Sequence, residues 1–324
     1  MKILVTGAAG YIGSVVTSQL IEDGHEVLAF DNLYHGHREA VHPEATFCHG
    51  DLLDVRRVHE CMSDNVDAVV HLAAEALIGE SMKDPGKFYR ANLTGGLNLL
   101  DAMAECGVRR LVFSSTAAVY GDHDIMPITE DAPRTPVNAY GDSKLAFEQA
   151  LEWYHRAHDI RYATFRYFNV CGATEAHGSL HDPETHLIPI LLDVALGRRP
   201  PLQLYGTDYD TPDGTCIRDY IHVSDIAQAH LLALENVDRL GACIFNIGNE
   251  HGYSNLQVIE AVRRVTGRDI AFEPAERRLG DPAQLVASDR KAREVLGWRP
   301  QYPELDDMVA TAWAWALRLS QGVK

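Results

Sequence analysis

The stretch Ile3-Leu4-Val5-Thr6-Gly7-Ala8-Ala9-Gly10-Tyr11-Ile12-Gly13 decides the fold of this 324-residue chain. Its short apolar run is typical of a buried parallel strand. The glycines follow at the spacing GxxGxxG, and residues 15–21 continue with an apolar pattern at helical spacing. A second apolar run, 26–30, ends at Asp31. The order of strand, glycine turn, helix and strand predicts a βαβ unit that binds a dinucleotide.

The glycines and the acid each have a physical role in such a unit. Gly7 permits the tight turn, Gly10 lets the backbone approach a pyrophosphate, and Gly13 lets helix and strand pack closely. The start of the helix then presents free N–H groups and the positive end of its dipole to the phosphates. Asp31 is placed to accept the ribose hydroxyls, and its charge repels a 2′-phosphate. We therefore expect the cofactor to be NAD rather than NADP.

The alternation of strands and helices continues beyond this unit. Further strands are predicted at 45–48, 67–72, 110–113 and 161–166, and helices at 55–62, 85–106 and 140–154. This order predicts an α/β fold. We expect a Rossmann-type doubly wound parallel sheet with helices on both faces and a ligand across the carboxyl ends of its strands.

The second half of the chain has a looser pattern, which predicts a smaller mixed α/β domain. Gly, Pro, His and Asp are frequent up to about residue 214, and helices are predicted near 188–196, 255–266 and 289–296. The apolar run 244–248 is expected to return as an outer strand of the first sheet. We therefore expect an NAD-binding domain over 1–169, onto which about 217–248 packs back, and an interleaved second domain over 170–324.

Tyr140 and Lys144 are the clearest catalytic candidates. They lie four residues apart at the start of the helix predicted over 140–154, so both project from one face. A cation beside a phenol favours the phenolate and lowers the pKa of the phenol, which then serves as a general acid/base. Taken alone, the same spacing also fits an ordinary surface pair.

A hydroxyl cluster, Ser114-Ser115-Thr116, follows the strand predicted at 110–113. Hydroxyls at the carboxyl end of a strand can bind a hydroxyl or carbonyl of a substrate. They can equally satisfy their own backbone in a turn. The residues alone leave both interpretations open.

Composition argues against two classes of partner. A formal net charge of −17 argues against binding to nucleic acid or to an anionic membrane surface. No apolar run reaches membrane-spanning length, and glycines follow the first residues before the core of a signal peptide could form. We therefore expect a cytoplasmic protein that binds neither nucleic acid nor membrane.

The cysteines and histidines favour neither disulfides nor a metal site. Six cysteines are scattered without a CxxC pair, which is typical of reduced thiols: Cys48, Cys61, Cys106, Cys171, Cys216 and Cys243. Four histidines are candidate metal ligands: His35, His37, His181 and His186. They form no compact set with carboxylates at the spacing of metal ligands. We expect no bound metal.

Taken together, the motifs resemble the extended short-chain dehydrogenase/reductase family. The glycine turn, Asp31, the hydroxyl cluster and the Tyr140/Lys144 pair carry the likeness, as do 206–215 (GTDYDTPDGT) and 218–223 (RDYIHV). Within the epimerase/dehydratase group, the chain is similar to members that interconvert UDP-galactose and UDP-glucose at C4. The likeness implies a UDP-sugar substrate bound by the second domain and transient hydride transfer to tightly bound NAD through a 4-keto sugar. It also implies a homodimer formed through helices 85–106 and 140–154.

Residue roles carry over from the family by position. The resemblance implies that Tyr140 is the acid/base, that Lys144 lowers its pKa, and that Thr116 bonds the 4-oxygen of the sugar. The implied cofactor-binding residues are Gly7, Gly10, Tyr11, Ile12, Gly13, Asp31, Asn32, Asp51, Leu52, Leu72, Ala73, Ala74, Asn92, Ser114, Tyr140, Lys144 and Phe168. The implied substrate-binding residues are Thr116, Tyr140, Asn169, His186, Leu187, Gln203, Tyr205, Arg218, Arg278 and Asp281.

Three positions depart from the best-known members. Glu75-Ala76 stands where many have a Lys near the nicotinamide, and His186 stands where others place an Asn that contacts the nucleotide. Leu285 occupies a position where hexose-restricted members carry a bulky Tyr. The smaller side chain leaves room for a 2-acetamido group, so activity on UDP-GlcNAc and UDP-GalNAc is an additional hypothesis.

Rival functions within and beyond the family can be compared on the same residues. A 4,6-dehydratase needs an acid pair beside the hydroxyl, and Ala117-Ala118 occupies those positions. A UDP-uronate epimerase or a decarboxylating relative remains an alternative. An NAD-sensing regulatory protein on the same fold is an alternative of another class, although such proteins can dispense with the Tyr–Lys pair that this chain retains.

Overall fold

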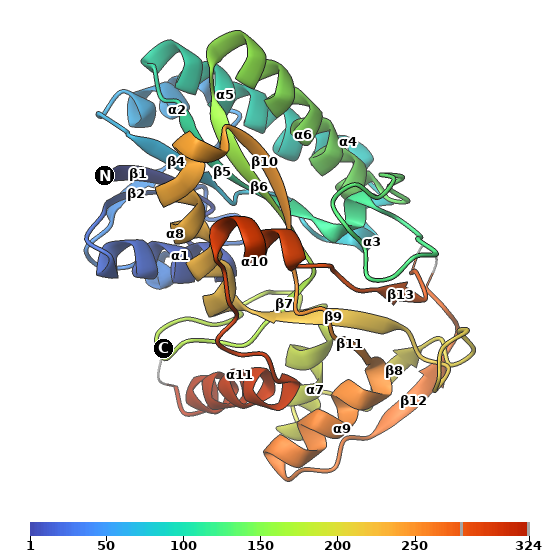
Figure 1. The fold of residues 1–324 in the computed structure, drawn as a ribbon. Coiled ribbons are helices and arrows are strands. Elements are labelled where there is room, and N and C mark those ends of the chain that lie inside the picture. Colours follow the sequence, from blue (N-terminus) through green and yellow to red (C-terminus); the bar gives the residue numbers. More distant parts are fainter. Residues whose placement is uncertain (279–280, 323–324) are drawn as a thin grey trace.

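A seven-stranded parallel sheet forms the larger part of the molecule (Figure 1). The computed structural model describes residues 1–278 and 281–322. The strand order is β10-β6-β5-β4-β1-β2-β3, and all neighbours pair in parallel. The strands are β1 (Lys2–Thr6), β2 (Glu26–Asp31), β3 (Thr46–His49), β4 (Ala68–His71), β5 (Arg110–Thr116), β6 (Arg161–Tyr167) and β10 (Ala242–Ile247). The predicted doubly wound α/β fold is confirmed.

Helices cover both faces of this sheet, and each face has its own apolar core. One face is covered by α1 (Tyr11–Glu22), α8 (Val223–Leu240) and α10 (Arg290–Leu296). The opposite face is covered by α2 (Val55–Met62), α5 (Gly95–Cys106) and α6 (Ala139–His158). Because both sheet faces are buried, the strands are continuous apolar runs rather than alternating ones.

The helix predicted over 85–106 is helical throughout but changes its pitch on the way. It consists of α4 (Pro85–Phe88), a π-helical segment (Tyr89–Thr94) and α5, and the short helix α3 (Ile78–Ser81) precedes it. A π-helical turn widens the backbone and is frequent at functional sites. Short 3₁₀ turns occur at Arg38–Ala40 and Ala117–Val119.

A smaller sheet and three helices make up the second part of the chain, at the bottom of Figure 1. Strand β9 (Ile217–His222) pairs with β7 (Asn169–Cys171), β11 (Gly252–Ser254) and β13 (Gln284–Leu285). Strands β8 (Leu202–Tyr205) and β12 (Phe272–Ala275) form a separate parallel pair. Helices α7 (Leu187–Ala195), α9 (Asn255–Thr266) and α11 (Leu305–Ser320) enclose a third apolar core.

The chain passes between the two parts more than once. After β9, which belongs to the smaller sheet, α8 packs beside α1 and β10 joins the edge of the main sheet next to β6. The return to the main sheet therefore begins at α8. The path then leaves again through β11 and comes back through α10.

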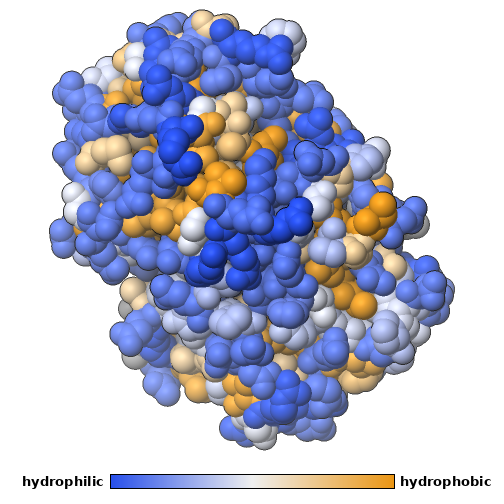
Figure 2. Space-filling view, viewed as in Figure 1, coloured by the Kyte–Doolittle hydropathy of each residue, from blue (hydrophilic) through white to orange (hydrophobic). Residues whose placement is uncertain are grey.

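The visible surface is mostly hydrophilic. Figure 2 shows hydrophilic side chains over most of the visible face, with apolar groups in scattered patches. Among the helices of the described residues, none is both long enough and apolar enough to cross a membrane.

One expectation about the cysteines is wrong. Cys48 on β3 and Cys61 on α2 form a disulfide, with Cα atoms 7.0 Å apart, whereas Cys106, Cys171, Cys216 and Cys243 are free. The two bonded residues are separated by 13 positions and meet because α2 packs back onto its own strand. A search for closely spaced pairs does not detect a contact of this kind.

His230 on α8 should make the stability of the fold pH-dependent. It is fully buried; its Nδ1 donates to the carbonyl of Ile226 (2.9 Å), and its Nε2 accepts from the hydroxyl of Tyr167 (2.7 Å). Burial lowers the pKa of His230 to about 4. A histidine with a lowered folded-state pKa contributes stability above its unfolded pKa near 6.5 and loses it as the pH falls toward 4.

We therefore expect His230→Gln to flatten the acid side of the stability curve. Between pH 6 and 4 the unfolding free energy of the wild type should fall more steeply than that of the variant, by about 1.4 kcal/mol per pH unit. Denaturant titrations at several pH values measure the difference, in which the contributions of the other titrating groups cancel. Parallel curves would show that His230 is not held neutral.

Candidate active site

Gly7 and Gly13 stand where the structure has no space for a side chain. Gly7 has a positive φ of 72°, and a Cβ there would lie 2.6 Å from the amide nitrogen of Ala73. A Cβ on Gly13 would lie 2.0 Å from the carbonyl oxygen of Gly7. The turn, the first turn of α1 and the end of β4 therefore meet backbone to backbone, which only glycine permits.

The amino terminus of α1 is suited to a pyrophosphate. Its N-cap is Gly10, and no side chain caps the helix. The first N–H groups of the helix consequently keep their capacity to bind an anion, and the helix dipole favours negative charge at this end.

Asp31 lies at the end of β2, where its carboxylate is buried but not saturated. Its oxygens accept from the backbone N–H groups of Ala9 (3.0 Å) and Leu33 (2.8 Å). A carboxylate offers about four acceptor sites, so capacity for two ribose hydroxyls is left. Gly36 leaves the adjoining space open, because a Cβ there would lie 2.8 Å from an oxygen of Asp31. The residues present therefore fit an adenosine ribose.

Tyr140, Lys144 and Thr116 converge where β5 ends and α6 begins. Asn138 caps α6 by accepting from the N–H of Gly141 (2.8 Å), which fixes the first turn that carries Tyr140. The side chain of Thr116 lies close enough to the hydroxyl of Tyr140 to lower the pKa of that phenol. Lys144 is buried, and its Nζ donates to the carbonyl of Ser114 (2.8 Å). The structure brings the three predicted catalytic residues to one place.

Burial, rather than the neighbouring cation, dominates the ionisation of this pair in the protein by itself. It raises the pKa of Tyr140, and the hydrogen bond from Thr116 only partly offsets that shift. Burial also lowers the pKa of Lys144 to about 7, although the carboxylate of Glu148 acts in the opposite direction. The expectation of a lowered pKa for Tyr140 from helix spacing alone was wrong, because spacing carries no information about desolvation.

A buried ionic network lies directly behind the pair. Arg166 on β6 binds Glu148 on α6 with two donors, at 3.0 and 2.6 Å, and both side chains are 1% exposed. The hydroxyl of Ser115 also donates to Glu148 (2.5 Å). Arg166 also donates a hydrogen bond to the hydroxyl of Tyr120 (2.7 Å). That hydroxyl donates to the side chain of Asn246 on β10 (2.6 Å). The network ties α6 to β5, β6 and β10.

Sequence reasoning did not identify this network. Two signals were available: Glu148 lies four residues after Lys144, on the same helical face, and Arg166 is a charge that directly follows the apolar residues of β6. A charge in that position is rarely buried without a partner.

The other predicted cofactor residues lie along the same edge of the sheet. Leu72, Ala73 and Ala74 follow β4, and Ser114 lies on β5. Asn32 donates to Asp51 (2.8 Å), just before Leu52. Tyr11 and Ile12 lie in the first turn of α1, and Phe168 joins β6 to β7.

Asn92 and Glu75 have structural partners. Asn92, in the π-helical segment, donates to the carbonyl of Glu75 (3.0 Å) and to Ser143 (2.9 Å), and it accepts from the N–H of Glu75 (2.8 Å). The carboxylate of Glu75, one of the departures from the family pattern, forms an ion pair with Lys87 (3.1 Å) and a hydrogen bond with Nε2 of His35 (3.1 Å). Lys87 also pairs with Glu80 (2.9 Å), so both carboxylates share this lysine.

The predicted substrate residues fall on the smaller sheet and the segments around it. Arg218 on β9 is 8% exposed and binds the carboxylate of Asp281 and the carbonyl of Pro282 (2.8 Å). The guanidinium of Arg278 lies 4.1 Å from the centroid of the Tyr205 ring. Arg218 also donates to the carbonyl of Ile217 (2.8 Å), so three of its five N–H donors have partners within the protein.

The remaining predicted substrate residues lie on the same part of the chain. Gln203 on β8 donates to Glu273 on β12 (2.9 Å). Asn169 begins β7 and is exposed, and its side chain is hydrogen-bonded to Tyr220. His186 is the N-cap residue of α7, and Leu187 is its first residue.

Two of the loop histidines are not isolated. Contrary to expectation, His181 and His186 do form a compact set with a carboxylate, that of Glu184. His35 and His37 lie outside this set. Chain spacing did not reveal the set because the three residues lie in the segment between β7 and α7, where no regular helix or strand fixes the direction of the side chains.

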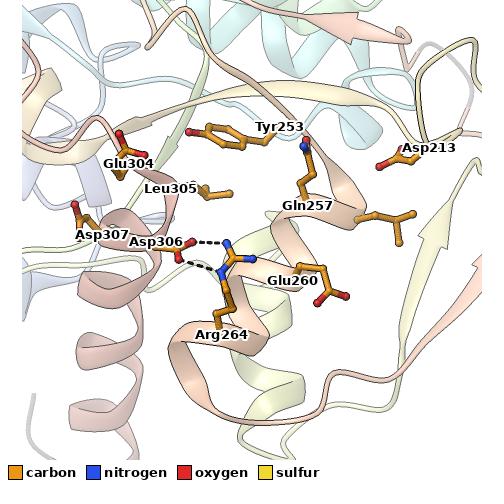
Figure 3. A pocket seen from close by; sticks show the side chains of 10 residues that line it. Asp213, Tyr253, Gln257, Glu260, Arg264, Glu304, Leu305, Asp306 and Asp307 are labelled. Atoms are coloured by element: carbon orange, nitrogen blue, oxygen red, sulfur yellow. Dashed lines mark hydrogen bonds and ion pairs between the residues drawn. The ribbon is translucent and has the colours of Figure 1, made fainter.

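A cavity of about 850 Å³ lies away from these residues, between α9 and α11 (Figure 3). Half of the residues that line it are carboxylates, and Arg264 and Asp306 form an ion pair at its wall (2.7 Å). No predicted catalytic or cofactor residue lines it. The predicted catalytic and cofactor residues therefore lie at the carboxyl edge of the main sheet and not at this cavity.

The glycine turn lies where the strand order of the parallel sheet reverses, and the pair of Tyr140 and Lys144 lies at the same edge. This combination is typical of an enzyme that uses a nicotinamide cofactor. Comparison with known proteins specifies which kind. The sequence model of the NAD dependent epimerase/dehydratase family matches residues 3–248, so the chain belongs to that family and its cofactor is NAD.

Several relatives are similar over almost the whole chain. A UDP-glucose 4-epimerase of Streptococcus mutans is 51% identical over 323 residues, covering 97% of this chain and 96% of the relative. The structure of UDP-glucose 4-epimerase from Brucella ovis in complex with NAD is 42% identical, with a TM-score of 0.94 over 97% of this chain and 98% of that one. The structure of the UDP-Glc/GlcNAc 4-epimerase from Campylobacter jejuni is 37% identical, with a TM-score of 0.87 over 98% and 99%.

Proposed function

We propose that this protein reversibly inverts C4 of a UDP-hexose, interconverting UDP-galactose and UDP-glucose. The observation that carries the proposal is the convergence of Tyr140 and Thr116 with the buried Lys144, at the same sheet edge as the glycine turn. The names of the relatives similar over the full chain support the same substrate class.

Tyr140 acts as the acid/base for the 4-hydroxyl. Its phenolate takes the proton of that hydroxyl and returns it after the sugar has turned over. Thr116 bonds the same oxygen and orients it. When bound, NAD supplies the site that accepts a hydride from C4 and gives it back to the opposite face of the 4-keto sugar.

Lys144 adjusts the charge of the site. With a pKa of about 7, it holds or releases a proton at neutral pH at little cost. When charged, it stabilises the phenolate electrostatically, four residues away on α6. The buried ion pair between Glu148 and Arg166 keeps that part of α6 in place.

The nucleotide must stay anchored while the keto sugar rotates. We assign this anchoring to Arg218 and Arg278, whose guanidinium groups suit phosphate oxygens. In this arrangement residues 1–169, together with 223–248, bind NAD, and the remainder of 170–324 binds the nucleotide-sugar. Turnover leaves NAD unchanged overall, so one bound cofactor serves many cycles.

Purified protein tests this function without any added cofactor. Incubation with UDP-galactose should yield UDP-glucose with no NAD supplied, and denaturation should release about one NAD per chain. A requirement for added NAD, or net accumulation of NADH during conversion, would contradict an epimerase and indicate a dehydrogenase.

We further propose that the enzyme accepts N-acetylated UDP-sugars. Leu285 on β13 is half-buried and stands in register with Arg218 on β9, the proposed diphosphate ligand. A leucine there leaves more room beside the sugar than an aromatic ring would. The relative from Campylobacter jejuni that is named for both sugars supports this extension.

Leu285→Tyr should separate the two activities. The added ring should lower kcat/KM for UDP-GlcNAc by roughly tenfold or more, because a misfit in a pocket costs about 1–3 kcal/mol, and should spare UDP-galactose. The control is Gln284→Tyr, whose side chain leaves the strand on the opposite face. No turnover of UDP-GlcNAc by the wild type would remove this extension.

We also propose that two copies pair through helices 85–106 and 140–154. Trp153 on α6 is 67% exposed, an unusual position for so large an apolar ring on a monomer. Trp153→Glu should convert a dimer of 35.9 kDa chains into monomers in sedimentation experiments, because it would bury a charge without a partner. Ile125→Glu, equally exposed at 71% but away from these helices, is the control. A monomeric wild type would exclude the dimer.

A further inference from the structure

The loop over residues 172–186, between β7 and α7, joins the two parts of the protein. Tyr11 on α1 donates to a carbonyl at the start of this loop (2.6 Å), and Trp315 on α11 donates to another carbonyl near its middle (3.1 Å). Ser18 on α1 is hydrogen-bonded to His177 (2.7 Å). Because Tyr11 belongs to the glycine turn, the conformation of the loop bears directly on the NAD site.

Three side chains with metal-ligand chemistry meet at the end of this loop. One ring nitrogen of His181, one carboxylate oxygen of Glu184 and one ring nitrogen of His186 all lie within 4.8 Å of one another. Glu184 bridges the other two: its oxygens lie 3.8 Å from His181 and 2.7 Å from His186. The carboxylate is 9% exposed, while the two imidazole rings are 34% and 55% exposed.

This geometry is close to that of a bound transition metal. A tetrahedral Zn²⁺ with ligands at about 2.0–2.1 Å places them about 3.4 Å from each other. Reaching that separation needs small rotations of two partly exposed imidazoles around a buried, fixed carboxylate. Imidazole nitrogen and carboxylate oxygen are ligands that zinc accepts together, with a fourth position left to water or another group.

The carboxylate is already held in place for such a role. Its Oε1 accepts from the backbone N–H groups of Thr185 (2.8 Å) and His186 (2.9 Å). The hydroxyl of Ser179 donates to its other oxygen (2.7 Å). Outer hydrogen bonds of this kind orient metal ligands and strengthen binding.

We propose that His181, Glu184 and His186 bind one divalent transition-metal ion, of which Zn²⁺ is the best match. The ion closes the loop 172–186 onto the start of α7 and so steadies the segment that contacts Tyr11. The proposal does not depend on the reaction that the enzyme catalyses, since binding can be measured without substrate.

Zinc affinity of the NAD-loaded protein tests the site. Protein dialysed against a chelator is titrated with Zn²⁺ in competition with a chromophoric chelator. The wild type should bind one ion per chain. His181→Gln and Glu184→Gln should each weaken binding more than tenfold, since loss of even an outer-shell partner costs roughly 10–100-fold. The matched control is His59→Gln, which removes a histidine from the two-residue pair with Glu105 (2.6 Å) and should bind as the wild type does.

Two further readouts distinguish a metal site from a hydrogen-bonded ion pair. Co²⁺ in place of Zn²⁺ should give the visible absorption of a tetrahedral site in the wild type and lose it in His181→Gln. Added Zn²⁺ should raise the melting temperature of the wild type by mass action but not that of the variant. No competitive binding by the wild type, or equal weakening in His59→Gln, would overturn the proposal.

Discussion

Tyr140→Phe should abolish nearly all epimerisation while leaving the fold and its bound NAD in place. The variant keeps the ring and its packing against Phe88 and loses only the hydroxyl that meets Thr116. Removal of a general acid/base lowers the rate by roughly 10²–10⁴-fold. Conversion of UDP-galactose and the NAD content of the purified variant are the two measurements.

A tyrosine on the same helix provides the control. The hydroxyl of Tyr154 on α6 donates to Asp101 at the surface. Tyr154→Phe should therefore keep nearly full activity. Substantial turnover in Tyr140→Phe would contradict the assigned acid/base, and an equal loss in Tyr154→Phe would show that the effect is not specific to the site.

Glu148→Gln should destabilise the protein by about 3–5 kcal/mol, because it leaves the guanidinium of Arg166 buried without its counter-charge. Both partners are 1% exposed, so solvent cannot compensate. The same change removes the carboxylate that raises the pKa of Lys144, so less of the lysine should be charged at neutral pH and the turnover number should fall as well. Denaturant unfolding and the pH–rate profile measure the two effects.

Helix α6 also offers a matched exposed pair. Glu152 and Arg156 form an ion pair on its surface, with both side chains more than half exposed. Glu152→Gln should change the unfolding free energy by no more than about 0.5 kcal/mol. Equal, small losses in both variants would mean that the buried pair does not hold the helix in place.

Local patterns were sufficient to predict the main sheet. The apolar run at the start of 3–13 and the apolar runs after it indicate strands that are buried on both faces. Such a run consists of a few neighbouring residues and can be read directly from the sequence. The convergence of Tyr140, Lys144 and Thr116 also follows from local rules, because one strand ends and one helix begins at the same edge.

Features that depend on distant packing were not predictable in this way. Strand β9 pairs with three strands drawn from widely separated parts of the sequence. Arg166 finds Glu148 across the interface between strand and helix, and Cys48 meets Cys61 only because α2 folds back. The pKa of Tyr140 depends on desolvation by the whole site, so the spacing of Lys144 alone gave the wrong direction.

The fate of hydrogen at C4 tests the central claim most directly. UDP-galactose labelled with deuterium at C4 is converted in ordinary water with no NAD added, and the UDP-glucose formed is analysed by mass spectrometry and NMR. If the hydride leaves C4 and returns to the same carbon, the product should retain the deuterium at C4 in full. Exchange of the label with solvent would contradict the account, since it would show that C4 is inverted by removal of a proton.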